Sequence, residues 1–140
     1  MWEAKRVSGP SFRTLRFEIS SKGYFIMGCV LIVVDHFASR DVLRQLIEKD
    51  GRAVLTACDG REALECARSI PPPSIVLLDL LMPRMNGWEF LQHKNADPTI
   101  AGIPTIVLSG SSIDLPAGAM NLLANPVDIE RLLALIEQYC

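Results

Sequence analysis

Residues 75–87 read Ile-Val-Leu-Leu-Asp-Leu-Leu-Met-Pro-Arg-Met-Asn-Gly. The first four are aliphatic without alternation, a pattern typical of a strand buried on both faces of a parallel sheet. Asp79 ends this run, and open α/β sheets bind their ligands at the carboxyl ends of strands. An Asp that only caps the following turn is the simpler alternative, but an ionised carboxylate is costly to bury without partners. Asp79 is therefore the first candidate functional residue.

From Gly28 onward, strand-like and helix-like segments alternate on both sides of this run. Apolar runs predict strands at 29–34, 53–57, 75–78, 104–108 and 120–124. Amphipathic patterns predict helices at about 39–50, 61–69, 87–95 and 128–139. We expect Ser39 to cap the first helix, Gly51 to end it and Val42 to lie on its inward face. This order predicts an α/β fold, a doubly wound five-stranded parallel sheet with helices on both faces.

The connection between the fourth and fifth predicted strands is unusually short. Residues 109–120 include Gly110 and Pro116, and a parallel crossover needs about a dozen residues or more. We expect an irregular loop with at most one helical turn, so that the fourth helix is shortened or missing.

Residues 1–27 differ in composition from the rest of the chain. They carry five basic side chains against two acidic ones, and their apolar residues show only brief alternation around Phe17. We expect a mobile N-terminal extension here, with a short extra strand as one option, ahead of a single domain at 28–140. A translation start at Met27 and a partner-binding arm are the alternatives.

Composition excludes several classes of protein. The chain has 140 residues, 49% apolar and 21% charged, which suits one globular domain with one core. A net charge of −2 gives no reason to expect nucleic-acid binding. Four cysteines without C-x-x-C spacing favour reduced thiols in a cytoplasmic protein over a disulfide framework or zinc site. The longest apolar run, 24–34, is too short to span a membrane.

The predicted strand ends bring several polar side chains to one edge of the sheet: Asp35, His36, Asp79, Ser109 and Asn125. A carboxylate on the central strand can accept a phosphoryl group as an acyl phosphate. Such a transfer depends on positioning and on cations that neutralise the phosphoryl oxygens. A Mg²⁺ held by carboxylates, a hydroxyl donor and a lysine would meet those needs.

The chain from Cys29 to Cys140 resembles the receiver domain of bacterial two-component response regulators, the CheY-like family. The motifs that carry the resemblance are Val33-Val34-Asp35, Leu77-Leu78-Asp79 with Met82-Pro83-x-Met85-x-Gly87, Pro104 to Gly110, and Gly118-Ala119-x-x-x-Leu123-x-Asn125-Pro126. The resemblance implies a flavodoxin-like fold with strand order 2-1-3-4-5. It also implies that a histidine kinase or phosphotransfer protein transfers a phosphoryl group to Asp79.

The resemblance implies a role for each site residue. Asp79 would accept the phosphoryl group and ligate Mg²⁺, and Asp35 would bind the metal through water. The backbone carbonyl of Leu81 would complete the metal site, and Ser109 would hydrogen-bond the phosphoryl group. Asn125 precedes the proline at which the family has a cis peptide bond.

Three positions depart from the family pattern and predict an atypical receiver. His36 stands where a second acidic residue usually ligates Mg²⁺, and imidazole suits that ion poorly. Asn125 stands where the family has lysine, so a hydrogen-bond donor replaces a positive charge. Leu122 stands where the family carries a switch aromatic. We therefore expect Mg²⁺ binding that His36 weakens.

Two functional hypotheses stay open. In the first, Asp79 is phosphorylated and the domain signals by protein contact, without being an enzyme and without binding nucleic acid or membranes. In the second, a degenerate receiver docks to partners independently of phosphorylation. A haloacid-dehalogenase-like phosphatase is disfavoured because Leu81 stands where that family needs a second Asp. A flavin-binding flavodoxin is disfavoured because no Ser/Thr-rich phosphate loop follows the first strand.

No pattern of an effector domain follows the closing helix before Cys140. We therefore expect either a stand-alone receiver or a piece of a larger protein. Its output would be a contact with another protein, through residues 1–27 or the exposed face of the first helix.

Overall fold

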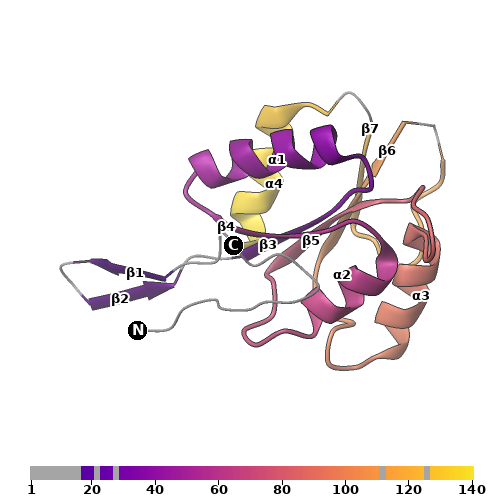
Figure 1. Cartoon of the computed structure of the whole chain (residues 1–140), viewed down its shortest axis with the longest axis horizontal. Coiled ribbons are helices and arrows are strands. Elements are labelled where there is room, and N and C mark those ends of the chain that lie inside the picture. Colours follow the sequence, from indigo (N-terminus) through magenta and orange to yellow (C-terminus); the bar gives the residue numbers. More distant parts are fainter. Residues whose placement is uncertain (1–16, 21–22, 27–28, 111–112, 125–126) are drawn as a thin grey trace.

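The computed structural model describes residues 17–20, 23–26, 29–110, 113–124 and 127–140. Its main sheet has five parallel strands in the order β4-β3-β5-β6-β7 (Figure 1). These strands are β3 (Cys29–Val33), β4 (Ala53–Ala57), β5 (Ile75–Asp79), β6 (Thr105–Ser109) and β7 (Asn121–Ala124). Counted from β3, the order is 2-1-3-4-5, so the predicted flavodoxin-like α/β fold is confirmed.

In the described part of the chain, four helices cover the two faces of the sheet: α1 (Phe37–Lys49), α2 (Gly60–Ala67), α3 (Gly87–Ala96) and α4 (Ile129–Tyr139). α1 and α4 lie on one face, and α2 and α3 lie on the other (Figure 1). Side chains of β3 alternate between the two cores, with Leu31 packed toward α2 and α3 and Ile32 toward α1 and α4. Burial on both faces explains why the strands are continuous apolar runs.

The connection between β6 and β7 is irregular, as expected. Its described residues, 110 and 113–120, contain no helix, so the fourth helix of the doubly wound pattern is missing from that part of the chain. The connection is held against α3, since the Asn95 side chain donates to the Ala117 carbonyl at 3.2 Å. The Met120 amide then donates to the Thr105 carbonyl at 2.8 Å and leads into β7.

The first helix begins earlier than predicted. Its N-cap is His36, whose Nδ1 accepts the Ser39 amide at 3.3 Å. The prediction that Ser39 caps this helix was therefore wrong, because the imidazole nitrogen supplies the acceptor three residues earlier. Val42 was also misplaced, since it is 55% exposed. The prediction of Gly51 as the stop was correct: it has a φ of 93° and donates to the Glu48 carbonyl at 2.9 Å.

Two further strands precede the main sheet. β1 (Phe17–Ser20) and β2 (Gly23–Ile26) pair antiparallel and form a sheet of their own (Figure 1). One extra strand was an option in this region, and its described residues, 17–20 and 23–26, contain two. The rest of residues 1–27, including the alternative start at Met27, lies outside the described residues, and the mobility of this extension stays a prediction. None of the helices described has both the length and the apolar composition needed to cross a bilayer.

Candidate functional site

The carboxyl ends of β3, β5 and β6 meet at one edge of the sheet. Asp79 is the last residue of the central strand β5, and it pairs in register with Leu108 of β6. This register places Ser109 one residue further along β6, at the end of that strand. Asp35 follows β3 by two residues. The topology therefore brings the predicted phosphoacceptor, metal ligand and hydroxyl donor to the same edge.

The Asp79 carboxyl group is half-buried and interacts with the loop that follows it. Its Oδ1 accepts the Leu81 amide at 3.3 Å. Burial raises the pKa of Asp79, the Leu81 and Leu80 amides partly offset this rise, and the negative charge of Asp35 adds to it. Asp35 and Asp79 therefore repel each other at this edge, as expected for two carboxylates that share a site.

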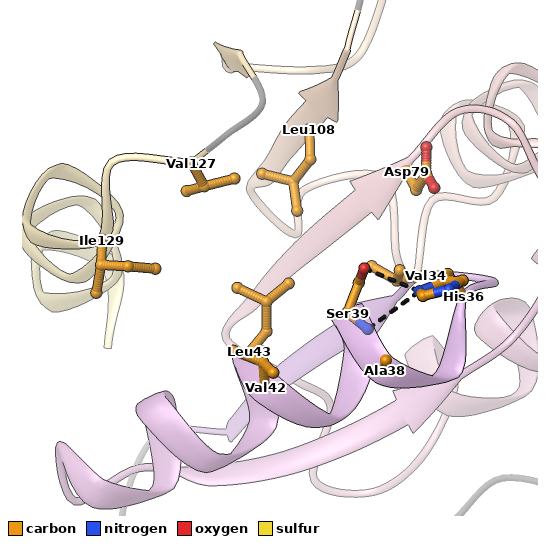
Figure 2. A pocket seen from close by; sticks show the side chains of 10 residues that line it. All are labelled: Val34, His36, Ala38, Ser39, Val42, Leu43, Asp79, Leu108, Val127 and Ile129. Atoms are coloured by element: carbon orange, nitrogen blue, oxygen red, sulfur yellow. Dashed lines mark hydrogen bonds between the residues drawn. The ribbon is translucent and has the colours of Figure 1, made fainter.

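His36 and Asp79 both line a cavity of about 430 Å³ between the start of α1, the ends of β5 and β6, and the start of α4 (Figure 2). The other side chains that line it are mostly apolar: Val34, Ala38, Ser39, Val42, Leu43, Leu108, Val127 and Ile129. The His36 Nδ1 atom faces Ser39, lying 3.1 Å from its Oγ (Figure 2). One of the two imidazole nitrogens is therefore used by the helix cap and not by the cavity.

The turn after β3, which carries Asp35, is fixed by a residue that sequence analysis missed. Arg40 Nη1 donates to the carbonyls of Val34 at 2.8 Å and Asp35 at 3.0 Å. Its guanidinium carbon also lies 5.4 Å from the centre of the Phe37 ring. The only sequence signal for this role is the position of an Arg in the first turn of a helix, where a positive charge opposes the helix dipole.

The remaining predicted site residues differ in exposure. Ser109 is buried, with 9% of its surface exposed, whereas Leu81 is 74% exposed. Asn125, with the proline peptide bond that follows it, lies outside the described residues. β7 ends beside it at Ala124, which pairs with Ser109. The consequences of Asn125 in place of lysine therefore stay predictions.

The loop after Asp79 is closed by local contacts that the sequence motif supplies. The Gly87 amide donates to the Leu80 carbonyl at 2.9 Å. Asn86 caps α3 by accepting the Glu89 amide at 2.9 Å, and the Glu89 carboxylate accepts the Asn86 amide at 3.0 Å. This reciprocal arrangement is a capping box. It fixes the return of the chain from the site into α3, where Trp88 is partly exposed.

The oxygen donors at this edge fit a magnesium ion. Among the described residues, no three side chains of His, Cys, Asp or Glu gather closely enough to hold a metal by themselves. The candidate donors are the Asp35 and Asp79 carboxylates and the Leu81 carbonyl, all hard oxygen atoms. Mg²⁺ usually keeps several waters and binds through one or two carboxylates. A dication here would also offset the repulsion between the two aspartates.

Comparison with known proteins gives one consistent result. The family model of the response regulator receiver domain matches residues 30–137 of this chain. Protein PilH of Pseudomonas aeruginosa is 32% identical over 116 residues, which cover 79% of this chain and 95% of that protein.

Solved structures agree with this match. Chemotaxis response regulator CheY4 of Vibrio cholerae superposes with a TM-score of 0.72 at 28% identity, covering 81% of this chain and 99% of that one. The receiver domain of sensor histidine kinase PA1611 from Pseudomonas aeruginosa has a TM-score of 0.73 at 21% identity, covering 81% of this chain and 97% of that one. That structure is described as having a magnesium ion coordinated in its active-site cleft.

Proposed function

This chain belongs to the response regulator receiver domain family of two-component signalling, and from that premise we propose that it accepts a phosphoryl group on Asp79 and signals by contact with another protein. The phosphoryl donor would be a histidine kinase or a phosphotransfer protein. The observation that carries the proposal is the position of Asp79 on the central strand, within electrostatic reach of Asp35 and one register step from Ser109.

The proposed transfer needs little from the protein beyond positioning and charge. An Asp79 oxygen would attack the phosphorus, so that an O–P bond forms while the N–P bond of the donor phosphohistidine breaks. The Leu81 amide orients the Asp79 carboxylate through its 3.3 Å hydrogen bond. When bound by Asp35, Asp79 and the Leu81 carbonyl, Mg²⁺ would neutralise charge on the phosphoryl oxygens. The domain would be a substrate of the transfer and not an independent enzyme.

The second candidate function is a docking module that works without phosphorylation. It is favoured by the use of His36 in the helix cap, which occupies one of the imidazole nitrogens. It is also favoured by the negative charge of Asp35, which acts on the Asp79 carboxyl group. Without Mg²⁺, this site would repel an incoming phosphoryl group. The two candidates therefore differ in whether the site binds Mg²⁺ and a phosphoryl group.

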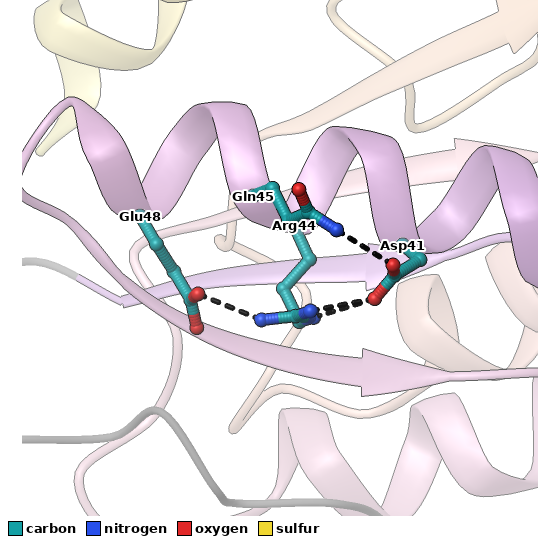
Figure 3. A network of polar contacts seen from close by, with 4 residues as sticks. All are labelled: Asp41, Arg44, Gln45 and Glu48. Carbon is teal, nitrogen blue, oxygen red and sulfur yellow. Dashed lines mark hydrogen bonds and ion pairs between the residues drawn. The ribbon is translucent and has the colours of Figure 1, made fainter.

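We place the partner contact on α1. Phe37 and Val42 are exposed apolar side chains of this helix, and Val42 lines the cavity described above. Elsewhere on α1, Arg44 donates to Asp41 at 2.6 Å and to Glu48 at 2.7 Å (Figure 3). Because two carboxylates of its own helix hold Arg44, the two apolar side chains are the better candidates for a contact. All four cysteines are free, which suits a partner met in a reducing cytoplasm.

A beryllofluoride titration in the presence of Mg²⁺ tests the proposed function, because this ion mimics a phosphoryl group on a carboxylate. Amide NMR and Trp88 fluorescence would follow binding, in a Trp2→Phe background that leaves Trp88 as the sole tryptophan. We expect saturable binding that requires Mg²⁺ and is lost in Asp79→Asn. Absence of binding at millimolar Mg²⁺ would reject the phosphoacceptor function in favour of the docking module.

His36→Asp is expected to tighten Mg²⁺ binding about tenfold. A second carboxylate adds attraction to the dication, and one charge pair near a protein surface contributes roughly 1–4 kcal/mol. Asp is also a good N-cap, so the substitution keeps an acceptor for the Ser39 amide. His36→Asn is the matched control, since Asn caps equally well without the charge. Equal Mg²⁺ affinity in the Asp and Asn variants would contradict the role given to residue 36.

A further inference from the structure

Two loops at the edge of the sheet that carries Asp79 are joined by short contacts. The first loop links β4 to α2 and contains Asp59, and the second comprises residues 80–86 and is called here the 80–86 loop. Arg84 Nε donates to Asp59 Oδ2 at 2.5 Å. The Gly60 amide donates to the Met85 carbonyl at 2.8 Å. A Cβ atom on Gly60 would lie 2.6 Å from Met85 Cγ, so the two loops are packed in direct contact.

Asp59 is a buried carboxylate with partners in its own helix and in the 80–86 loop. Only 3% of its surface is exposed, and its Oδ1 caps α2 by accepting the Glu62 amide at 2.9 Å. Burial alone would raise the pKa of Asp59, but the Glu62 amide, the Arg84 guanidinium and, least, the Arg61 amide together lower it. A neutral Asn or Ser would cap the helix as well. The charge of Asp59 is therefore explained by Arg84 and not by the cap.

Arg84 has a backbone conformation that does not suit its side chain. Its φ is 63°, in the left-handed region, which is unfavourable for a residue with a Cβ and natural for glycine. The guanidinium is bound to Asp59, and a second nitrogen lies 3.8 Å from Cys58 Sγ. The Asp59 carboxylate has little exposed surface and needs a charged partner. The ion pair that Arg84 forms with it therefore offsets the free-energy cost of the Arg84 backbone conformation.

From these contacts, and on the premise of the proposed function, we propose that Asp59 and Arg84 are positioning residues for the phosphoryl and metal site. Neither residue touches the reacting atoms. Their ion pair fixes the middle of the 80–86 loop, and the bond between the Gly87 amide and the Leu80 carbonyl fixes its ends. The same loop carries the Leu81 amide that orients Asp79.

Two variants separate this role from a general loss of stability. Asp59→Asn removes the charge and keeps an oxygen that can cap α2. Arg84→Gly removes the guanidinium and suits a φ of 63°. We expect each variant to weaken Mg²⁺ binding about tenfold, the lower end of the range for residues that support metal ligands. We also expect faster hydrogen exchange of the Leu81 and Gly87 amides, measured without metal, at unchanged exchange of amides in β3.

The matched control is an ion pair of the same kind outside the site. Arg68 Nε donates to Asp97 Oδ2 at 2.9 Å, joining the end of α2 to the segment after α3. Arg68→Gln should leave the Mg²⁺ affinity and the exchange of the Leu81 amide unchanged. In the double variant of Asp59→Asn and Arg84→Gly, the losses should not add, because both substitutions break the same contact.

Wild-type Mg²⁺ affinity and wild-type amide exchange in both single variants would overturn the positioning role. So would an equal loss of affinity in Arg68→Gln, since the effect would then come from global destabilisation. Failure of the wild-type chain to bind Mg²⁺ would reject the proposed function instead. In that case the exchange rates of Leu81 and Gly87, measured without metal, still decide whether the ion pair holds the loop.

Discussion

Gly87→Ala is expected to destabilise the chain by about 3 kcal/mol, the upper end of the range for overpacking a well-packed region. A Cβ atom at this position would lie 2.7 Å from the Asp79 carbonyl oxygen and 2.7 Å from the Leu80 Cα. Both atoms are backbone, so neither can rotate away. The helix would regain up to about 1 kcal/mol from the better propensity of Ala, but the contact would displace the backbone that carries Asp79. Thermal denaturation should show a Tm lower by roughly 10 °C.

Gly102→Ala is the matched control for this substitution. A Cβ at Gly102 would have no neighbour within 4 Å, and Gly102 has no positive φ. The control should match the wild type or exceed its stability by about 0.4–1 kcal/mol, because Ala restricts the unfolded chain. If Gly87→Ala unfolds at the same temperature as Gly102→Ala, the close packing of α3 against the Asp79 backbone is not as described.

Much of the fold was predictable from the sequence because the apolar pattern is determined by burial. The strands of the main sheet begin and end within two residues of their predicted bounds. β5 shows why: residues 75–78 have no exposed surface, so each position requires an apolar side chain. The short connection after β6 was predictable as well, because residue count limits what a crossover can contain.

Local side-chain chemistry was harder to predict. His36 caps α1 although His is not among the preferred capping residues. Lys94 lies on the inward face of α3 with 1% of its surface exposed, and its Nζ donates to the Ala101 carbonyl at 2.9 Å. Burial lowers the pKa of Lys94. In a periodic apolar pattern, a lysine on the inward face counts against a helix. The pattern cannot show that the ammonium group of this lysine closes the turn after the helix.

In the candidate site too, the position of the residues was easier to predict than their side-chain contacts. The position of Asp35, Asp79 and Ser109 at one edge was predictable because strand ends of a parallel sheet meet there, whereas their roles stay predictions. The Asp59–Arg84 ion pair joins residues 25 positions apart. Its formation depends on how the loop after β4 meets the loop after β5, which no local pattern describes. The sequence therefore indicates the groups at the site, and the structure adds the contacts that hold them.

Ser109→Ala is expected to slow phosphoryl transfer to Asp79 by about 10²–10³-fold, the usual effect of removing one preorganised donor. Ser109 ends β6 beside Asp79, and only 9% of its surface is exposed, so water cannot easily replace its hydroxyl. The rate would be measured by mass spectrometry as uptake of a phosphoryl group from a small acyl phosphate at saturating Mg²⁺. Asp79→Asn provides the background rate.

Ser109→Thr separates the hydroxyl from the shape of the side chain. Thr keeps the donor, and its β-branched side chain is well suited to a strand. We expect it to retain most of the wild-type rate, while Ala loses it without a comparable loss of Tm. Because the Mg²⁺ ligands are untouched, the dissociation constant for Mg²⁺ should stay the same in both variants. An Ala variant as fast as the Thr variant would show that the hydroxyl does not stabilise the transferring group, and the charge on the phosphoryl oxygens would then have to be balanced by the metal alone.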